Sequence, residues 1–461
     1  MGEEPSRASN HLPDKGIILV KIQYRLGLFG YFAHPELEGT NFGVSDQTCA
    51  LEWVRDNIAC FGGDPNCVTI FGVSSGGDSV ANQLISPRAK GLFHRAILQS
   101  ANCSHQFVHH KRAFLAYDSA EDCGAAFASA VVGDGPGQLQ RLREMPAQDL
   151  ADAYSDRMDP FMEWQGFVSD AAPSRSLCAV SLTATRNAGS GRTSTGRYYR
   201  QPSTLRTQPA SITMCPSSSV RRSFWMPEPK DFRFRWFCLK AWTGCNSNEG
   251  SGTYTTRHWG RVRGFTHPHP LPDHPAAGPD PECYGGRRLE LAALYPGLTH
   301  DDPRAIQDLS GDQSFGHKAR WFAIHSRTPA WLYSFQRQPP GKRHTTGAPH
   351  GGEVAFVHGF DEDSRQCMSL AGPHCPEDFA LADTMHDYWT AFAKTGDPNR
   401  HNAGGVPHWP VYEHGGSARM MALDHVCCDT PVLSAPKFDL LDVWLQAAVV
   451  DELRPAAGAK L

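Results

Sequence analysis

The stretch Gly72-Val73-Ser74-Ser75-Gly76 constrains the fold of this chain more than any other part of the sequence. An apolar run at residues 68–71 comes directly before it and predicts a buried strand, and residues 79–85 after it have the pattern of a helix. A serine flanked by glycines between a strand and a helix is typical of a sharp turn that exposes the serine side chain. The sequence therefore predicts a strand–turn–helix unit centred on Ser74.

The residue types in this turn suit acyl transfer. Gly72 and Gly76 are expected to let the strand and the helix approach each other closely, which larger side chains would prevent. The hydroxyl group of Ser74 would be the nucleophile, and the backbone N–H of Ser75 would point toward the oxyanion that forms during the reaction. The alternative is a glycine-rich connection in which Ser74 is an ordinary exposed serine.

The chain around this unit alternates between predicted strands and helices. Residues 16–24 and 95–98 are short apolar runs typical of buried parallel strands, and residues 46–58 carry apolar side chains at helical spacing. This alternation predicts an α/β fold with a parallel sheet. Residues 284–461 return to a globular composition and include a predicted helix at 379–394, and a length of 461 residues fits one large domain or two to three smaller ones.

Several segments resemble the type-B carboxylesterases, an α/β-hydrolase family that includes the cholinesterases, fungal lipases and the non-catalytic neuroligins. The segments that carry the resemblance are 20–32 (VKIQYRLGLFGYF), 41–58, 61–77, 91–100, 309–315, 329–335 and 387–399. It covers roughly residues 16–170 and 242–445. The resemblance implies one α/β-hydrolase domain over residues 1–461, with a mostly parallel central sheet flanked by helices, that lacks the family's N-terminal strands.

The resemblance also nominates a catalytic triad. Ser74 matches the nucleophile, Glu249 lies in a segment (GCNSNEG) like that of the family's acid, and His350 lies in a segment (GAPHGGE) like that of its base. The chain order of serine, acid and histidine is that of the α/β-hydrolases. The implied chemistry is hydrolysis of carboxylic esters through an acyl-enzyme, without a cofactor, on a small-molecule or lipid ester.

The sequence departs from the family in ways that favour a second hypothesis. The family's glycine-rich oxyanion loop is expected upstream of Lys15 and is absent, and Val73 stands where the family has glutamate. Losing one oxyanion donor costs on the order of 100–1000-fold in turnover. The alternative function is therefore a catalytically impaired or non-catalytic member, such as a neuroligin-like binding domain. Ser100 matches a family serine near the triad acid, or is simply a turn serine.

Residues 171–241 do not resemble the family. The part at 171–227 contains eight arginines and no lysine or acidic residue, among Ser, Thr, Pro and Gly. Such a composition predicts disorder, because too little apolar surface is available to offset the chain entropy. The segment is either an insert or translated sequence foreign to the fold. Arginine-rich RNA binding is the less favoured alternative, since no RNA-binding motif accompanies the arginines.

Other features limit the classes of partner. A net charge of −4 argues against a protein built wholly to bind nucleic acid. The sequence contains no run of 18 apolar residues, so no transmembrane helix is predicted. The fourteen cysteines form no CxxC pair and leave free thiols and disulfides equally open. The group His267, His269, Asp273 and His274 is not expected to bind metal. Oligomeric state and cellular location are not predicted.

Overall fold

The computed structural model describes a set of segments from residue 11 to residue 441. These are 11–101, 109–111, 118–155, 181–186, 235–240, 293–296, 305, 308–309, 311–338, 348, 350–360, 375–400, 405–413, 418–431, 437–439 and 441. Glu249, the histidines at 267–274 and most of residues 171–241 lie outside these segments.

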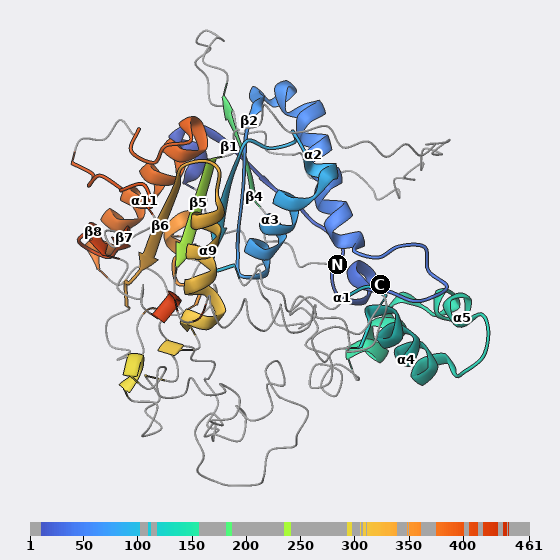
Figure 1. The fold of residues 1–461 in the computed structure, drawn as a ribbon. Helices are drawn as coiled ribbons and strands as arrows, with labels where there is room; N and C mark the ends of the chain where they lie inside the picture. The colour runs from blue at the N-terminus through green and yellow to red at the C-terminus, as the bar shows by residue number, and fades with distance from the viewer. Residues whose placement is uncertain are drawn as a thin grey trace.

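An eight-stranded sheet forms the centre of the fold, in the order β1-β4-β2-β3-β5-β6-β7-β8 (Figure 1). The strands are β1 (Ile17–Lys21), β2 (Gly63–Val73), β3 (Arg95–Gln99), β4 (Ser181–Arg186), β5 (Arg235–Lys240), β6 (Ala330–Phe335), β7 (Arg419–Leu423) and β8 (Cys428–Pro431). The five strands β2, β3, β5, β6 and β7 run parallel to one another. The predicted α/β fold with a mostly parallel sheet is therefore confirmed.

Helices cover both faces of this sheet (Figure 1). The α-helices are α1 (Gly27–Tyr31), α2 (Phe42–Asn57), α3 (Ser75–Ile85), α4 (Ala120–Val132), α5 (Gln138–Glu144), α9 (His317–His325), α10 (Val354–His358) and α11 (Pro376–Thr395). Short turns of other helix types are η1 (Leu12–Lys15), η2 (Ile58–Phe61), η3 (Pro87–Ala89) and η8 (Asp312–Gly316). The predicted helices at 46–58 and 379–394 correspond to α2 and α11.

Alternating strand residues divide the core between the two faces. Phe71 of β2 and Ile97 of β3 pack in one apolar cluster with α10 and α11. Their neighbours in sequence, Ile70 and Ala96, pack in a second cluster with α2 and α3. Because successive side chains of a strand point to opposite faces, a continuous apolar run is what a strand covered on both sides requires. β6 alternates in the same way, since Leu332 faces α9.

A pair of helices stands away from the sheet. α4 and α5 lie beside α1 (Figure 1), and Phe127 of α4 contacts Phe32 edge to face at 6.0 Å between ring centroids. Leu142 of α5 belongs to the same small apolar cluster, which also takes in Leu28 of α1. This cluster anchors the pair without a direct role for the sheet.

The sheet differs from expectation at its first strand and within the arginine-rich segment. The predicted strand at 16–24 ends at Lys21, and β1 pairs antiparallel with β4 at one end of the described sheet. β4 falls within residues 171–227, where the composition predicts disorder, and β5 follows within 171–241; the structure places both strands in the sheet. Pairing with neighbouring strands supplies backbone hydrogen bonds that single-segment composition does not register.

Within the described segments, none of the helices combines the length and hydropathy needed to cross a bilayer.

Candidate active site

Ser74 lies between the last residue of β2 and the first residue of α3, in a backbone conformation that few residues adopt. Its φ is 56° and its ψ is −123°. A positive φ at a residue other than glycine costs free energy and persists only where surrounding contacts hold it. The Ser74 N–H donates to the carbonyl oxygen of Gln99 at 2.7 Å, and the Ser74 carbonyl accepts the N–H of Asp78 at 3.0 Å. These two bonds fix the turn between strand and helix.

Glycines around Ser74 allow the strand and the helix to meet. A Cβ placed on Gly72 would lie 2.5 Å from the carbonyl carbon and oxygen of Gly76, closer than any real Cβ contact. A Cβ on Gly77 would lie 2.9 Å from the Cβ of Ala101. The first contact explains why residue 72 is glycine, because the backbone of Gly76 occupies the space that a side chain at this position would need.

Ser75 begins α3 and is buried, with 5% of its surface exposed. The first N–H groups of an α-helix have no partner within the helix and carry the positive end of its dipole. A backbone donor at this position therefore lies where negative charge next to Ser74 would be stabilised.

His350 lies in the connection that leads from β6 to α10. Because β2, β3 and β6 are parallel, their carboxyl ends lie at one edge of the sheet, and this edge carries both Ser74 and the connection that contains His350. The His350 ring stacks on the ring of Phe315 in η8, with centroids 4.7 Å apart and planes 19° from parallel. Burial lowers the pKa of His350 to about 4, so its imidazole is neutral at pH 7.

Glu353 is a buried acid at this edge that sequence analysis did not nominate. Its side chain is fully buried, and burial raises its pKa to about 7, against smaller opposite effects of its own backbone and of the Gln99 side chain. The signal in the sequence is weak. Glu353 is a single acidic residue between His350 and the apolar run 354–357. Neither its charge nor its place in the sequence points to a site.

Gln99 joins the two halves of the candidate site. Its carbonyl oxygen accepts the Ser74 N–H, and its side chain lies close enough to Glu353 to influence the pKa of that carboxyl. Glu353 follows His350 by three residues, so the connection that carries His350 meets the turn at the end of β3. A second contact joins the neighbouring strand to α10, because the ring of Phe71 in β2 stacks on the ring of His358 with centroids 5.8 Å apart.

Ser100 follows Gln99 and is completely buried, with a φ of 48°. Among the residues that the structure describes, three other than glycine have a positive φ, and two of them, Ser74 and Ser100, lie at the ends of adjacent parallel strands. Backbone strain in the described segments gathers at this edge of the sheet, as it commonly does at functional sites.

Beyond this edge of the sheet, the structure bears on the other nominated residues and shows one further cluster. Glu249 and the histidine group at 267–274 lie outside the described residues. The seven cysteines that the structure describes with their side chains, Cys427 and Cys428 among them, are free thiols. Within the described segments, one group of side chains has metal-ligand chemistry and spacing, namely Cys375, Asp378 and His425.

Comparison with known proteins gives a consistent result. The model of the carboxylesterase family matches residues 2–179 and 298–432. Liver carboxylesterase from Sus scrofa is 28% identical over 416 residues, which cover 87% of this chain and 63% of that protein. Para-nitrobenzyl esterase from Bacillus subtilis (strain 168) is 40% identical over 156 residues, which cover 33% of this chain and 30% of that protein.

Solved structures agree on the fold. A PNB esterase aligns with a TM-score of 0.58 at 23% identity and covers 91% of this chain and 73% of its own. A thermophilic PNB esterase aligns with a TM-score of 0.59 at 24% identity. The chain spans less than two thirds of the length of the curated relatives it matches.

Proposed function

Because the chain belongs to the carboxylesterase family, we propose that it is a serine hydrolase that cleaves carboxylic esters through an acyl-enzyme on Ser74. The observation that carries the proposal is the conformation of Ser74. Its φ of 56°, between a buried strand and the start of a helix, is the geometry that presents a serine hydroxyl above a parallel sheet. A connection without this role has no need for a strained serine between two glycines that contact each other.

In the proposed reaction, the neutral imidazole of His350 accepts the hydroxyl proton of Ser74 while the Ser74 oxygen attacks the ester carbonyl carbon. The imidazolium then gives this proton to the alkoxide that leaves, so the alcohol departs and the acyl group stays on Ser74. A water molecule repeats the sequence and releases the acid. The pKa of about 4 supports His350 as the base, because a protonated imidazole could not begin the reaction.

Two further groups complete the proposal. The N–H of Ser75, at the start of α3, stabilises the oxyanion of the tetrahedral intermediate. Glu249 holds the tautomer of His350 and stabilises the imidazolium, a role carried over from the family's segment and from the chain order. The substrate class is a small-molecule or lipid ester, in keeping with the names of the relatives, a liver carboxylesterase and a para-nitrobenzyl esterase.

A fluorophosphonate probe tests the proposal directly, because it reacts only with an activated serine. The expected result is labelling of the folded chain that disappears in Ser74→Ala and persists in Ser45→Ala, a serine on α2 whose hydroxyl accepts a hydrogen bond from Arg88. Hydrolysis of a para-nitrophenyl ester should disappear in the same variant. A folded chain that is not labelled would support the alternative of a non-catalytic binding domain.

A further inference from the structure

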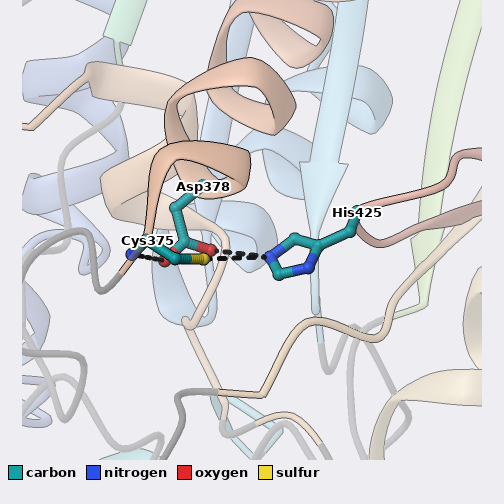
Figure 2. Close-up of side chains that lie close together, drawn as sticks. All are labelled: Cys375, Asp378 and His425. Atoms are coloured by element: carbon teal, nitrogen blue, oxygen red, sulfur yellow. Dashed lines mark hydrogen bonds and ion pairs between the residues drawn. The ribbon is translucent and has the colours of Figure 1, made fainter.

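Three donor atoms from distant parts of the sequence converge at the start of α11 (Figure 2). The Nε2 atom of His425 lies 3.7 Å from the Sγ of Cys375 and 3.1 Å from the Oδ1 of Asp378. One ligand atom from each of the three residues lies within 4.8 Å of the other two. A thiol, an imidazole and a carboxylate are the donor types that bind zinc in proteins.

Two rigid elements hold these side chains. Cys375 caps α11 and Asp378 lies in its first turn, and each side chain interacts with the backbone of the other in a capping box. His425 lies in the turn between β7 and β8. The site therefore forms only when the start of α11 packs against this turn, which makes it a property of the tertiary structure.

The contacts of Cys375 and Asp378 converge on one atom of His425 and are not arranged in series as in a catalytic triad. In a catalytic triad, the nucleophile and the acid contact different nitrogens of the histidine ring. Here the sulfur of Cys375 and the carboxylate of Asp378 both face Nε2 of His425 (Figure 2). Ligands of a tetrahedral zinc ion lie about 3.5 Å apart for a sulfur–nitrogen pair and about 3.3 Å apart for a nitrogen–oxygen pair, given bonds of about 2.3 and 2.0 Å. The observed separations match both.

Outer contacts orient the carboxylate, as is usual around metal ligands. Nε and Nη2 of Arg337 donate to the two oxygens of Asp378 at 2.5 and 3.1 Å, and the N–H of Cys375 donates to Oδ2 at 3.3 Å. Asp378 is completely buried, whereas His425 is partly open to solvent. The guanidinium cancels one of the two negative charges of a thiolate and a carboxylate, so the group carries one net negative charge toward a divalent ion.

We propose that Cys375, Asp378 and His425 form a binding site for a divalent transition metal of the zinc class, with water in the fourth position. Binding would release the thiol proton of Cys375 to solvent, since the thiolate is the ligand. A thiolate and an imidazole exclude magnesium and calcium, which take oxygen ligands. The site lies at the ends of β6 and β7, about 15–20 Å from the end of β2 at ordinary strand spacing, so its expected role is to join α11 to the β7–β8 turn.

Titration of the full chain with Co²⁺ tests the proposal, because a thiolate–Co²⁺ bond gives a charge-transfer absorption in the near ultraviolet. The expected result is saturable absorption that Zn²⁺ displaces. Cys375→Ser should abolish the absorption, and His425→Gln should weaken Co²⁺ affinity by about tenfold or more. Cys49→Ser is the matched control, since Cys49 is an exposed free thiol on α2, and it should leave both unchanged.

Replacing Cys375 with serine separates the effect of metal binding from the effect of helix capping. Serine is preferred at an N-cap, so Cys375→Ser keeps the start of α11 while removing the thiolate. Zn²⁺ should raise the melting temperature of the wild-type chain and of Cys49→Ser, but not that of Cys375→Ser. Absence of the absorption in the wild-type chain, or Cys375→Ser and His425→Gln variants that bind Co²⁺ as tightly as the wild type, would overturn the proposal and leave the cluster as a cap alone.

Discussion

Gly72 lies against the backbone of Gly76 with no room for a side chain between them, so the end of β2 and the first turn of α3 touch directly. A Cβ on Gly72 would lie 2.5 Å from the carbonyl group of Gly76. This contact brings the two ends of the turn together around Ser74, whose strained φ would relax if the strand and the helix moved apart.

Gly72→Ala should therefore disturb both the stability and the reactivity of the turn. The added methyl group must push the strand and the helix apart, which lowers the free energy of unfolding by about 1–3 kcal/mol. Fluorophosphonate labelling should fall sharply, and urea unfolding measures the stability. Gly135→Ala is the control, because Gly135 has a φ of 99° and open space around it, so it destabilises without touching the turn. Equal labelling of the two variants would contradict the prediction.

The pH dependence of hydrolysis should show the neutral state of His350. Burial lowers its pKa to about 4, so the acid limb of kcat/KM is expected below pH 6.5. His350→Gln should lower kcat by about 10⁴-fold or more, since the base acts in every step. His325→Gln, an exposed histidine that stacks on Trp321, should have no effect. An acid limb at or above pH 6.5 would contradict the proposed environment of His350.

Glu353 should make the folded chain less stable as pH rises. Its folded pKa of about 7 lies above its ordinary value of 4.5, so the folded state binds this proton more tightly than the unfolded chain does. The contribution of this proton to the free energy of unfolding is fully present below pH 4.5. About 3 kcal/mol of it is lost as pH rises through 7. Glu353→Gln should therefore be more stable than the wild type at pH 8. Exposed Glu144→Gln should show no such change, and parallel stability curves for all three chains would refute the prediction.

His386 should have the opposite effect at acidic pH. Its side chain is buried on α11, and burial lowers its folded pKa to about 4 from the ordinary 6.5. The unfolded chain binds the proton of His386 more tightly than the folded chain does. The free energy of unfolding is therefore not reduced by this group above pH 6.5, and it falls by about 3 kcal/mol as pH drops toward 4. His386→Phe keeps an aromatic ring beside His11 and should flatten this decline. Thermal unfolding between pH 4 and 7 checks it, with His325→Gln expected to follow the wild type.

Removal of Arg337 should be far more damaging than removal of a similar surface arginine. Arg337 pairs with Asp378, whose side chain is 1% exposed, and Arg337→Leu leaves this carboxylate buried without its charge partner. The expected loss is about 3–5 kcal/mol of unfolding free energy. Arg419→Leu breaks an exposed pair with Asp429 and should change stability little. Similar urea midpoints for the two variants would show that Asp378 finds another partner.

Local patterns made the turn and several helices predictable. The glycine spacing around Ser74 and the apolar run before it describe contacts within a few residues, and the structure reproduces the strand, the turn and the helix. The helical periodicity of α11 is equally local in its first half, where the buried residues between Asp378 and His386 recur at helical spacing, whereas residues 388–393 are all buried. Such features need no knowledge of the rest of the chain.

Features that depend on distant segments could not be predicted. β4 has no apolar run to mark it and gains its place from pairing with β1 and β2 on either side. Glu353 is a lone acid whose burial depends on the packing of α10. Cys375 and His425 are fifty residues apart, and only the meeting of α11 with the β7–β8 turn brings their side chains together.

The position of β4 between β1 and β2 has a consequence for how the sheet assembles. β1 and β2 are near in sequence, yet in the described sheet they do not pair with each other. Ile17 of β1 pairs instead with Thr185 of β4. Closing the long loop between β1 and β4 costs conformational entropy before the contacts between the two strands can form, and this slows folding. Within the described sheet, β1 therefore gains β4 as its partner only after residues 181–186 have been synthesised.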